Sequence, residues 1–76
     1  MRVTKSLNIQ GVSIISFEDA IKTALEETAL SIDHIFQMEV LGLRCTVKDN
    51  QIYEYIADTK ISFKIDTERK KNHEAH

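Results

Sequence analysis

Two long segments of alternating apolar and polar residues, joined by a short polar turn, constrain this chain most strongly. They cover residues 35–47 and 53–65, and residues 48–51 between them read Lys-Asp-Asn-Gln. A period of two is typical of β-strands, and such a polar linker is typical of a turn. The sequence therefore predicts a hairpin whose strands each span about 43 Å, at about 3.3 Å per residue.

A further strand and one helix are expected before this hairpin. Residues 2–10 alternate as a half-buried strand, and Gly11 and Ser13 then interrupt the pattern. Ser16 followed by Asp19 has the form of a helix N-cap, and the run that follows repeats its apolar residues at helical spacing. The apolar stripe consists of Phe17, Ile21, Ala24, Leu25, Thr28, Ala29 and Ile32. A helix of about 17 residues spans only about 26 Å.

The predicted fold is therefore α+β, with the order β-α-β-β and a three-stranded antiparallel sheet wrapped partly around one helix. One helix is too short to cover this hairpin, and the first hairpin segment is apolar on both faces. Apolar surface of that extent is usually buried by a partner, so we expect self-association. The residues expected to remain open are Phe36, Met38, Val40, Leu43, Ile52, Tyr53, Ile56 and Phe63.

Composition excludes several classes of protein. The chain has 76 residues, one cysteine and a formal net charge of −2. A chain of this length holds one core, a single cysteine forms no disulfide within it, and a slightly acidic balance argues against general nucleic-acid binding. No apolar run approaches a membrane span, and residues 1–10 do not resemble a signal peptide, so we expect a cytoplasmic protein with no membrane partner. We expect a folded domain over residues 1–66 and a charged, disordered tail over residues 67–76.

No catalytic motif stands in the chain, and we expect no enzyme. Cys45 is expected to be a small buried apolar residue, and His73 and His76 form no more than a weak metal site in a tail, so no metal site is predicted. Arg44 is a candidate contact for a ligand phosphate or carboxylate. The alternative is an interface ion pair with a carboxylate such as Glu39 or Glu54.

From about Lys5 to Ile65 the sequence resembles the dodecins, small β-α-β-β proteins that assemble as dodecamers and commonly bind flavins. The resemblance rests on the order and ungapped spacing of several short pieces. These are Gly11-Val-Ser13, Ser16-Phe17-Glu-Asp-Ala20-Ile21, Ala24, Ala29, Ser31, Ile32, Glu39-Val40, Tyr55 and Ile61-Ser-Phe63-Lys-Ile65. The resemblance implies a hollow homododecamer that stores a small ligand, with FMN or riboflavin as the cofactor.

The family's flavin site lies between subunits, where a tryptophan stacks on the ring and a glutamine binds its pyrimidine edge. By position these residues are Gln37 and Ile56 here, so the resemblance implies weakened flavin binding. Simple alternation turns Phe36 to the opposite face from Gln37, and it can replace the tryptophan only if the strand carries a bulge. The alternative function is a structural assembly that binds ions, coenzyme A or another ligand and no flavin.

Overall fold

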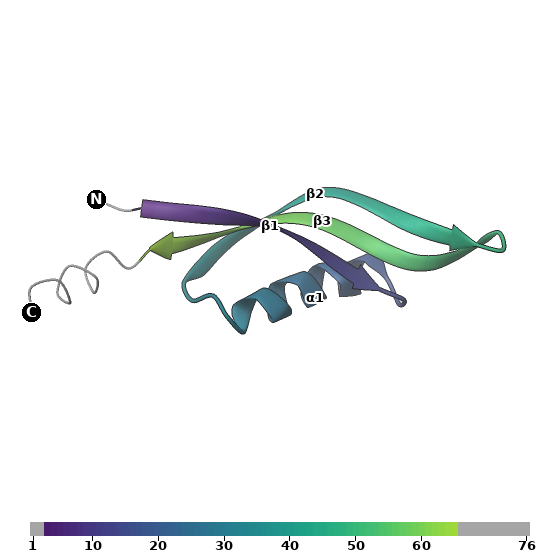
Figure 1. Cartoon of the computed structure of the whole chain (residues 1–76), viewed down its shortest axis with the longest axis horizontal. Helices are drawn as coiled ribbons and strands as arrows, with labels where there is room; N and C mark the ends of the chain where they lie inside the picture. Colours follow the sequence, from purple (N-terminus) through teal and green to yellow (C-terminus); the bar gives the residue numbers. More distant parts are fainter. Residues whose placement is uncertain (1–2, 66–76) are drawn as a thin grey trace, which may run out of the picture.

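The computed structural model describes residues 3–65, which form one sheet and one helix (Figure 1). The elements are β1 (Val3–Ser13), α1 (Phe17–Ala29), β2 (Ile35–Lys48) and β3 (Gln51–Ile65). All pairs are antiparallel and the order in the sheet is β1-β3-β2, so β3 is the central strand. The predicted fold class is confirmed. The tail predicted over residues 67–76 lies outside the described residues.

The hairpin turn forms where the sequence predicts it. Asp49 and Asn50 have φ values of 53° and 63°, and Lys48 pairs with Gln51. Two central residues with positive φ match the right-handed twist of the flanking strands, and Asn and Asp tolerate this conformation better than most residues. Figure 1 shows the resulting long β2–β3 ribbon extending past the N-terminal end of α1.

Strand β1 does not end at Gly11 as predicted, but continues to Ser13. The glycine is needed for packing rather than for breaking the strand. A Cβ atom built on Gly11 would clash with the backbone carbonyl oxygen of Ala20 and would lie 3.0 Å from the Cβ of Ala24. The absence of a side chain therefore lets α1 lie directly on the sheet.

The helix begins at the predicted cap and is shorter than predicted. The Ser16 hydroxyl accepts from the Asp19 amide at 3.0 Å, while the Asp19 carboxylate accepts from the Ser13 hydroxyl at 2.7 Å. The helix ends at Ala29, and the amides of Ser31 and Ile32 both donate to the carbonyl of Thr28. Its 13 residues span about 20 Å, less than half the length of β3.

The core between α1 and the sheet is thin. The buried helix residues are Ala20, Ala24 and Thr28, and they face Ala57 and Ile61 of the central strand. The Thr28 hydroxyl is satisfied by the carbonyl of Ala24 at 2.8 Å. Small residues on the helix bring its backbone close to the sheet but leave little apolar volume in the core.

The helix-side face of the β2–β3 hairpin extends beyond α1 and keeps an apolar surface, which we call the uncovered strip. It consists of Val40, Leu43, Val47 and Ile52, all exposed. The helix packs mainly against β1 and β3 and meets β2 only slightly. The prediction that one helix leaves much of the hairpin uncovered is confirmed. Cys45 lies among these residues and is exposed, so the prediction that it is buried is wrong.

Candidate functional site

The face of the sheet turned away from α1, here called the open face, carries most of the polar residues predicted to be functional. Tyr55 contacts Phe17 of the helix at a ring distance of 4.9 Å, so odd-numbered residues of the central stretch of β3 point to the helix. Even-numbered residues there point to the open face, together with the residues opposite them on β1 and β2.

A pocket of about 450 Å³ lies on this face, across all three strands. We call it the open-face pocket. Its lining combines polar and apolar surface, and Leu41 contributes an apolar side chain. The lining residues are Asn8, Ile9, Gln10, Leu41, Asp58 and Thr59.

Two bulges in β2 bring apolar side chains to the open face. Phe36 and Gln37 together oppose Ser62, and Leu41 and Gly42 together oppose Asp58. Where two residues oppose one, the extra residue falls out of the alternation. The single alternation predicted for residues 35–47 is therefore wrong after each bulge, and Leu41 lines the open-face pocket instead of facing the helix.

The bulge at Phe36 satisfies the condition under which this ring can replace the missing tryptophan. Phe36 is 48% exposed, and the ammonium group of Lys64 lies 5.6 Å from its ring centroid. Lys64 alternates onto the same face as Ser62. The ring therefore reaches the open face, next to Gln37.

The three predicted site residues share the open face but do not all meet within one protomer. Arg44 and Ile56 are directly opposite each other, whereas Gln37 is opposite Ser62. Six residues of β3 separate the two positions, or about 20 Å. The open-face pocket lies between them, with Asp58 in its lining.

Ile56 is only 7% exposed, because it lies in the central strand between Val12 and Arg44. The expectation that its side chain remains open is wrong. Within one protomer Ile56 is not among the residues that line the pocket and offers little surface to a ligand.

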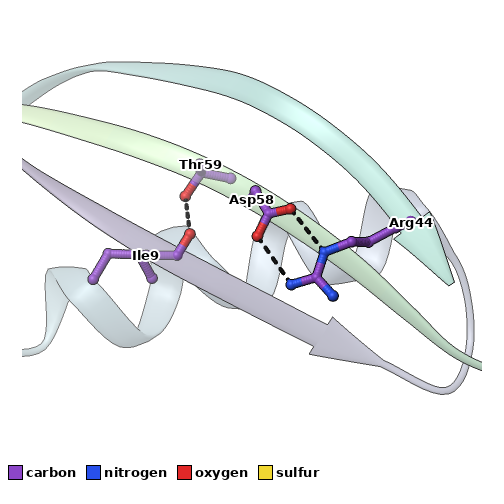
Figure 2. Close-up of polar contacts among 4 residues, drawn as sticks. All are labelled: Ile9, Arg44, Asp58 and Thr59. Carbon is purple, nitrogen blue, oxygen red and sulfur yellow. Dashed lines mark hydrogen bonds and ion pairs between the residues drawn. The ribbon is translucent and has the colours of Figure 1, made fainter. Parts of the chain in front are cut away.

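Arg44 pairs with a carboxylate that the sequence did not indicate. Its Nε and Nη2 atoms donate to the two carboxylate oxygens of Asp58 at 3.0 and 3.3 Å, as Figure 2 shows. Within the described residues Arg44 pairs with neither Glu39 nor Glu54, and its ion pair with Asp58 lies within one chain. Its hydrogen bond to Asp58 raises the pKa of Arg44, and the hydrogen bond from Arg44 chiefly lowers the pKa of Asp58, with a further contribution from Gln10.

The lowered pKa of Asp58 predicts that the ion pair is lost only in acid. A carboxylate whose pKa is lower in the folded state stabilises the fold above its unfolded pKa of about 3.9, and the effect is lost as pH falls through the folded pKa. We expect carboxyl NMR titration of Asp58 to give a midpoint below about 3.9. Arg44→Gln should raise that midpoint, and an unchanged midpoint would show that the guanidinium is not its cause.

Sequence reasoning missed Asn8, Gln10 and Asp58 as members of one site. The alternation of residues 2–10 does place Asn8 on the polar face of its strand. The alternation alone does not give the strand register, which places Asn8 opposite Lys60 and Gln10 opposite Asp58. Only pairing with the central strand joins these residues to Arg44.

Two further searches cover the described part of the chain. Within residues 3–65, no group of three or more His, Cys, Asp or Glu side chains is placed to hold a metal ion. The helix in this range is neither long nor apolar enough to cross a membrane.

Comparison with known proteins identifies the family. The family model for dodecins matches residues 3–66. A single-residue mutant of the Thermus thermophilus dodecin is 26% identical, with a TM-score of 0.83, over 87% of this chain and 98% of that chain. Dodecin from Streptomyces davaonensis, at 22% identity and a TM-score of 0.82 over 86% and 96% of the two chains, supports the fold alone.

Another similar structure is described as binding calcium. It is the calcium dodecin of Mycobacterium tuberculosis, a calcium-chelating antigen with a novel calcium-binding site, at 30% identity and a TM-score of 0.75 over 83% and 90% of the two chains. No curated protein matches the chain. Dodecins are small ligand-binding proteins that are not catalysts, are typically homo-oligomeric and bind flavins in some members. With its family match spanning every described residue and the same β-α-β-β fold, this chain belongs to the dodecin family.

Proposed function

We propose that this chain stores a small planar ligand of the flavin type, riboflavin or FMN, between the subunits of a hollow homododecamer. The observation that carries the proposal is the open-face pocket, with Phe36 and Gln37 on one side and Arg44 on the other. These flanking positions lie about 20 Å apart in one protomer. A second chain that approaches the pocket supplies the missing wall and encloses a flat ligand.

The shape of the protomer supports its assembly with other copies. Its radius of gyration is 16.4 Å, whereas a compact domain of this size has a radius of about 11 Å. The protomer measures 61 × 19 × 14 Å along its principal axes. So extended a chain, with an exposed uncovered strip, gains stability when copies of itself cover the strip. The exposed, unpaired Cys45 suits a reducing compartment, and we propose the cytoplasm.

Flavin affinity is weaker here than in dodecins that have a tryptophan at the position of Gln37. Phe36 offsets part of this loss, because the bulge presents its ring on the open face. Stacking of aromatic rings contributes about 0.5–1.5 kcal/mol beyond burial of area. Phe36 therefore supplies the planar surface against which the ligand ring lies.

Phe36→Ala tests this function directly. We expect it to weaken riboflavin binding by about three- to tenfold, measured by the quenching of flavin fluorescence on titration. Tyr53→Ala is the matched control, because Tyr53 is also an exposed aromatic but lies near the hairpin tip. Equal affinity in the Phe36→Ala and wild-type proteins would remove Phe36 from the site, and no quenching by wild-type protein at millimolar flavin would reject flavin binding.

Gln37→Trp should strengthen riboflavin binding if the open-face pocket otherwise accepts a flavin ring. A large ring at this exposed position should raise riboflavin affinity by about tenfold and increase quenching. Ile56 is not changed in this test, because a glutamine at that buried position would place an amide away from water. No gain in affinity would mean that the pocket itself does not accept a flavin ring.

The second candidate function is an assembly that binds ions, coenzyme A or another ligand without flavin. The replacements at Gln37 and Ile56 favour it, as does the existence of a calcium dodecin at 30% identity. Native mass spectrometry of protein purified without added ligand distinguishes the two functions. A retained flavin mass supports the first, and retained calcium or another small molecule with no flavin supports the second.

A further inference from the structure

Asp58 is the charged residue in the lining of the open-face pocket, and it is paired with Arg44 beside the pocket. Arg44 presents two donors of its planar guanidinium, Nε and Nη2, to Asp58, whose two oxygens accept them in parallel. This is the fork geometry with which arginine binds a phosphate or a ligand carboxylate. The Nε–Nη2 edge of the guanidinium is therefore already occupied by Asp58, and only its Nη1 side stays open to another acceptor.

Neutral hydrogen-bonding groups complete the pocket. Asn8 and Gln10 each offer an amide, which both donates and accepts, and Asp58 offers carboxylate oxygens. The Arg44–Asp58 pair adds no net charge. A phosphate entering here would be repelled by the Asp58 carboxylate, and it would have to displace that carboxylate to reach the Nε–Nη2 edge of the guanidinium.

Other charges on the open face lie beside the pocket rather than in it. Lys60 is opposite both Asn8 and Glu39, so a cation and an anion face each other there. Lys64 lies over the Phe36 ring. Neither lysine is among the residues that line the pocket.

We propose that Asp58 is the specificity-determining residue of this pocket, and that by occupying Arg44 it selects uncharged, hydrogen-bonding ligands over phosphate-bearing ones. The inference rests on the proposed function in that it concerns the same pocket. It narrows the ligand class to neutral ring compounds and polyols with several donors and acceptors. Between two ligands that share a ring, the one without a phosphate binds more tightly.

Riboflavin and FMN are suitable probes, since they share a ring and differ by one phosphate. Wild-type protein should bind riboflavin at least as tightly as FMN. Asp58→Asn keeps the size of the side chain but releases the guanidinium, and should raise FMN affinity relative to riboflavin by about tenfold, the effect of one charge-assisted hydrogen bond. Arg44→Gln added to Asp58→Asn should abolish this gain.

Glu39→Gln is the matched control. It also replaces a carboxylate by an amide on the open face, with the same change in net charge, but its register partner is Lys60. The ratio of the two affinities should stay at the wild-type value in this variant. An equal rise of the FMN affinity relative to riboflavin in both variants would indicate a general charge effect and overturn the proposal. An unchanged relative affinity in Asp58→Asn would overturn it as well.

Inorganic phosphate separates this inference from the proposed function. The Nε resonance of Arg44 should be unaffected by millimolar phosphate in wild-type protein and should shift in Asp58→Asn. If neither flavin binds wild-type protein, the proposed function fails while the phosphate titration still tests the role of Asp58. A wild-type Arg44 resonance that shifts on addition of millimolar phosphate would overturn the inference even if Asp58→Asn did not fold.

Discussion

Gly11→Ala is expected to destabilise the fold by about 3 kcal/mol, the upper end of the range for overpacking. The added methyl group would collide with the carbonyl oxygen of Ala20, and it would press on Ala24 at 3.0 Å. The first atom belongs to the helix backbone, which cannot rotate away as a side chain can. The helix must therefore move off the sheet and open the thin core. Thermal unfolding followed by circular dichroism at a fixed protein concentration should show a fall in Tm of more than about 10 °C.

Gly42→Ala is the control for this result. Gly42 also lies in a strand and has a negative φ, but a Cβ atom there meets nothing within 4 Å in its own chain. Replacing such a glycine restricts the unfolded chain and stabilises proteins by about 0.4–1 kcal/mol. If both variants lost stability equally, the effect would come from the loss of strand glycines in general, and the close contact at Gly11 would not explain it.

Local signals in the sequence predicted the elements of this fold well. The hairpin turn at Asp49 and Asn50 and the helix cap at Ser16 each depend on a few neighbouring residues, and both form as predicted. The self-association argument also needed only lengths, because a strand residue extends the chain about twice as far as a helical residue. The residues that carry these features were visible without any tertiary information.

The helix end and the first strand were predicted less well, for a tertiary reason. Gly11 was interpreted as a strand breaker, because a glycine inside a strand usually weakens it. In the structure it is a position where the backbone of α1 lies against β1. The helix pattern continued to Ile32, yet the chain leaves the helix at Ala29 and reaches β2 through His34, whose φ is 65°. Nothing local distinguishes a residue needed for packing from one that ends an element.

The candidate site depends most on information that alternation does not contain. Each bulge in β2 shifts the alternation by one residue, so Leu41 changes face and Phe36 joins Gln37. The pairing of Arg44 with Asp58 requires the register of β2 on β3, and the contributions of Asn8 and Gln10 require that of β1 on β3. A pocket made from three strands therefore appears only once the sheet is assembled.

The thin core and the uncovered strip are two consequences of the same helix. Its buried residues are mostly alanine, so it lies close to β1 and β3 and adds little apolar contact of its own. Because it spans only about 20 Å, the far part of the hairpin has no cover within residues 3–65. In the proposed assembly, contacts with other copies cover this surface and couple folding to assembly.

Leu43→Lys is accordingly expected to abolish assembly. Leu43 is 51% exposed in the protomer, opposite Ala57 and within the uncovered strip. Covering a leucine contributes about 1.5–3 kcal/mol, and burying an unpaired ammonium group instead costs several kcal/mol more. Each subunit carries the change, so the penalty recurs at every equivalent contact. Native mass spectrometry and sedimentation velocity at micromolar concentration should show a dodecamer for wild-type protein, and monomer or unfolded chain for Leu43→Lys.

Ser31→Lys provides the comparison, because it adds the same charge at an exposed polar position after α1, outside the uncovered strip. It should keep the wild-type mass. If Leu43→Lys also kept that mass, the uncovered strip would not be a contact between subunits. If wild-type protein were itself a compact, stable monomer at micromolar concentration, the length mismatch between helix and hairpin would have no bearing on assembly, and the ligand would have to bind the open-face pocket of a single chain.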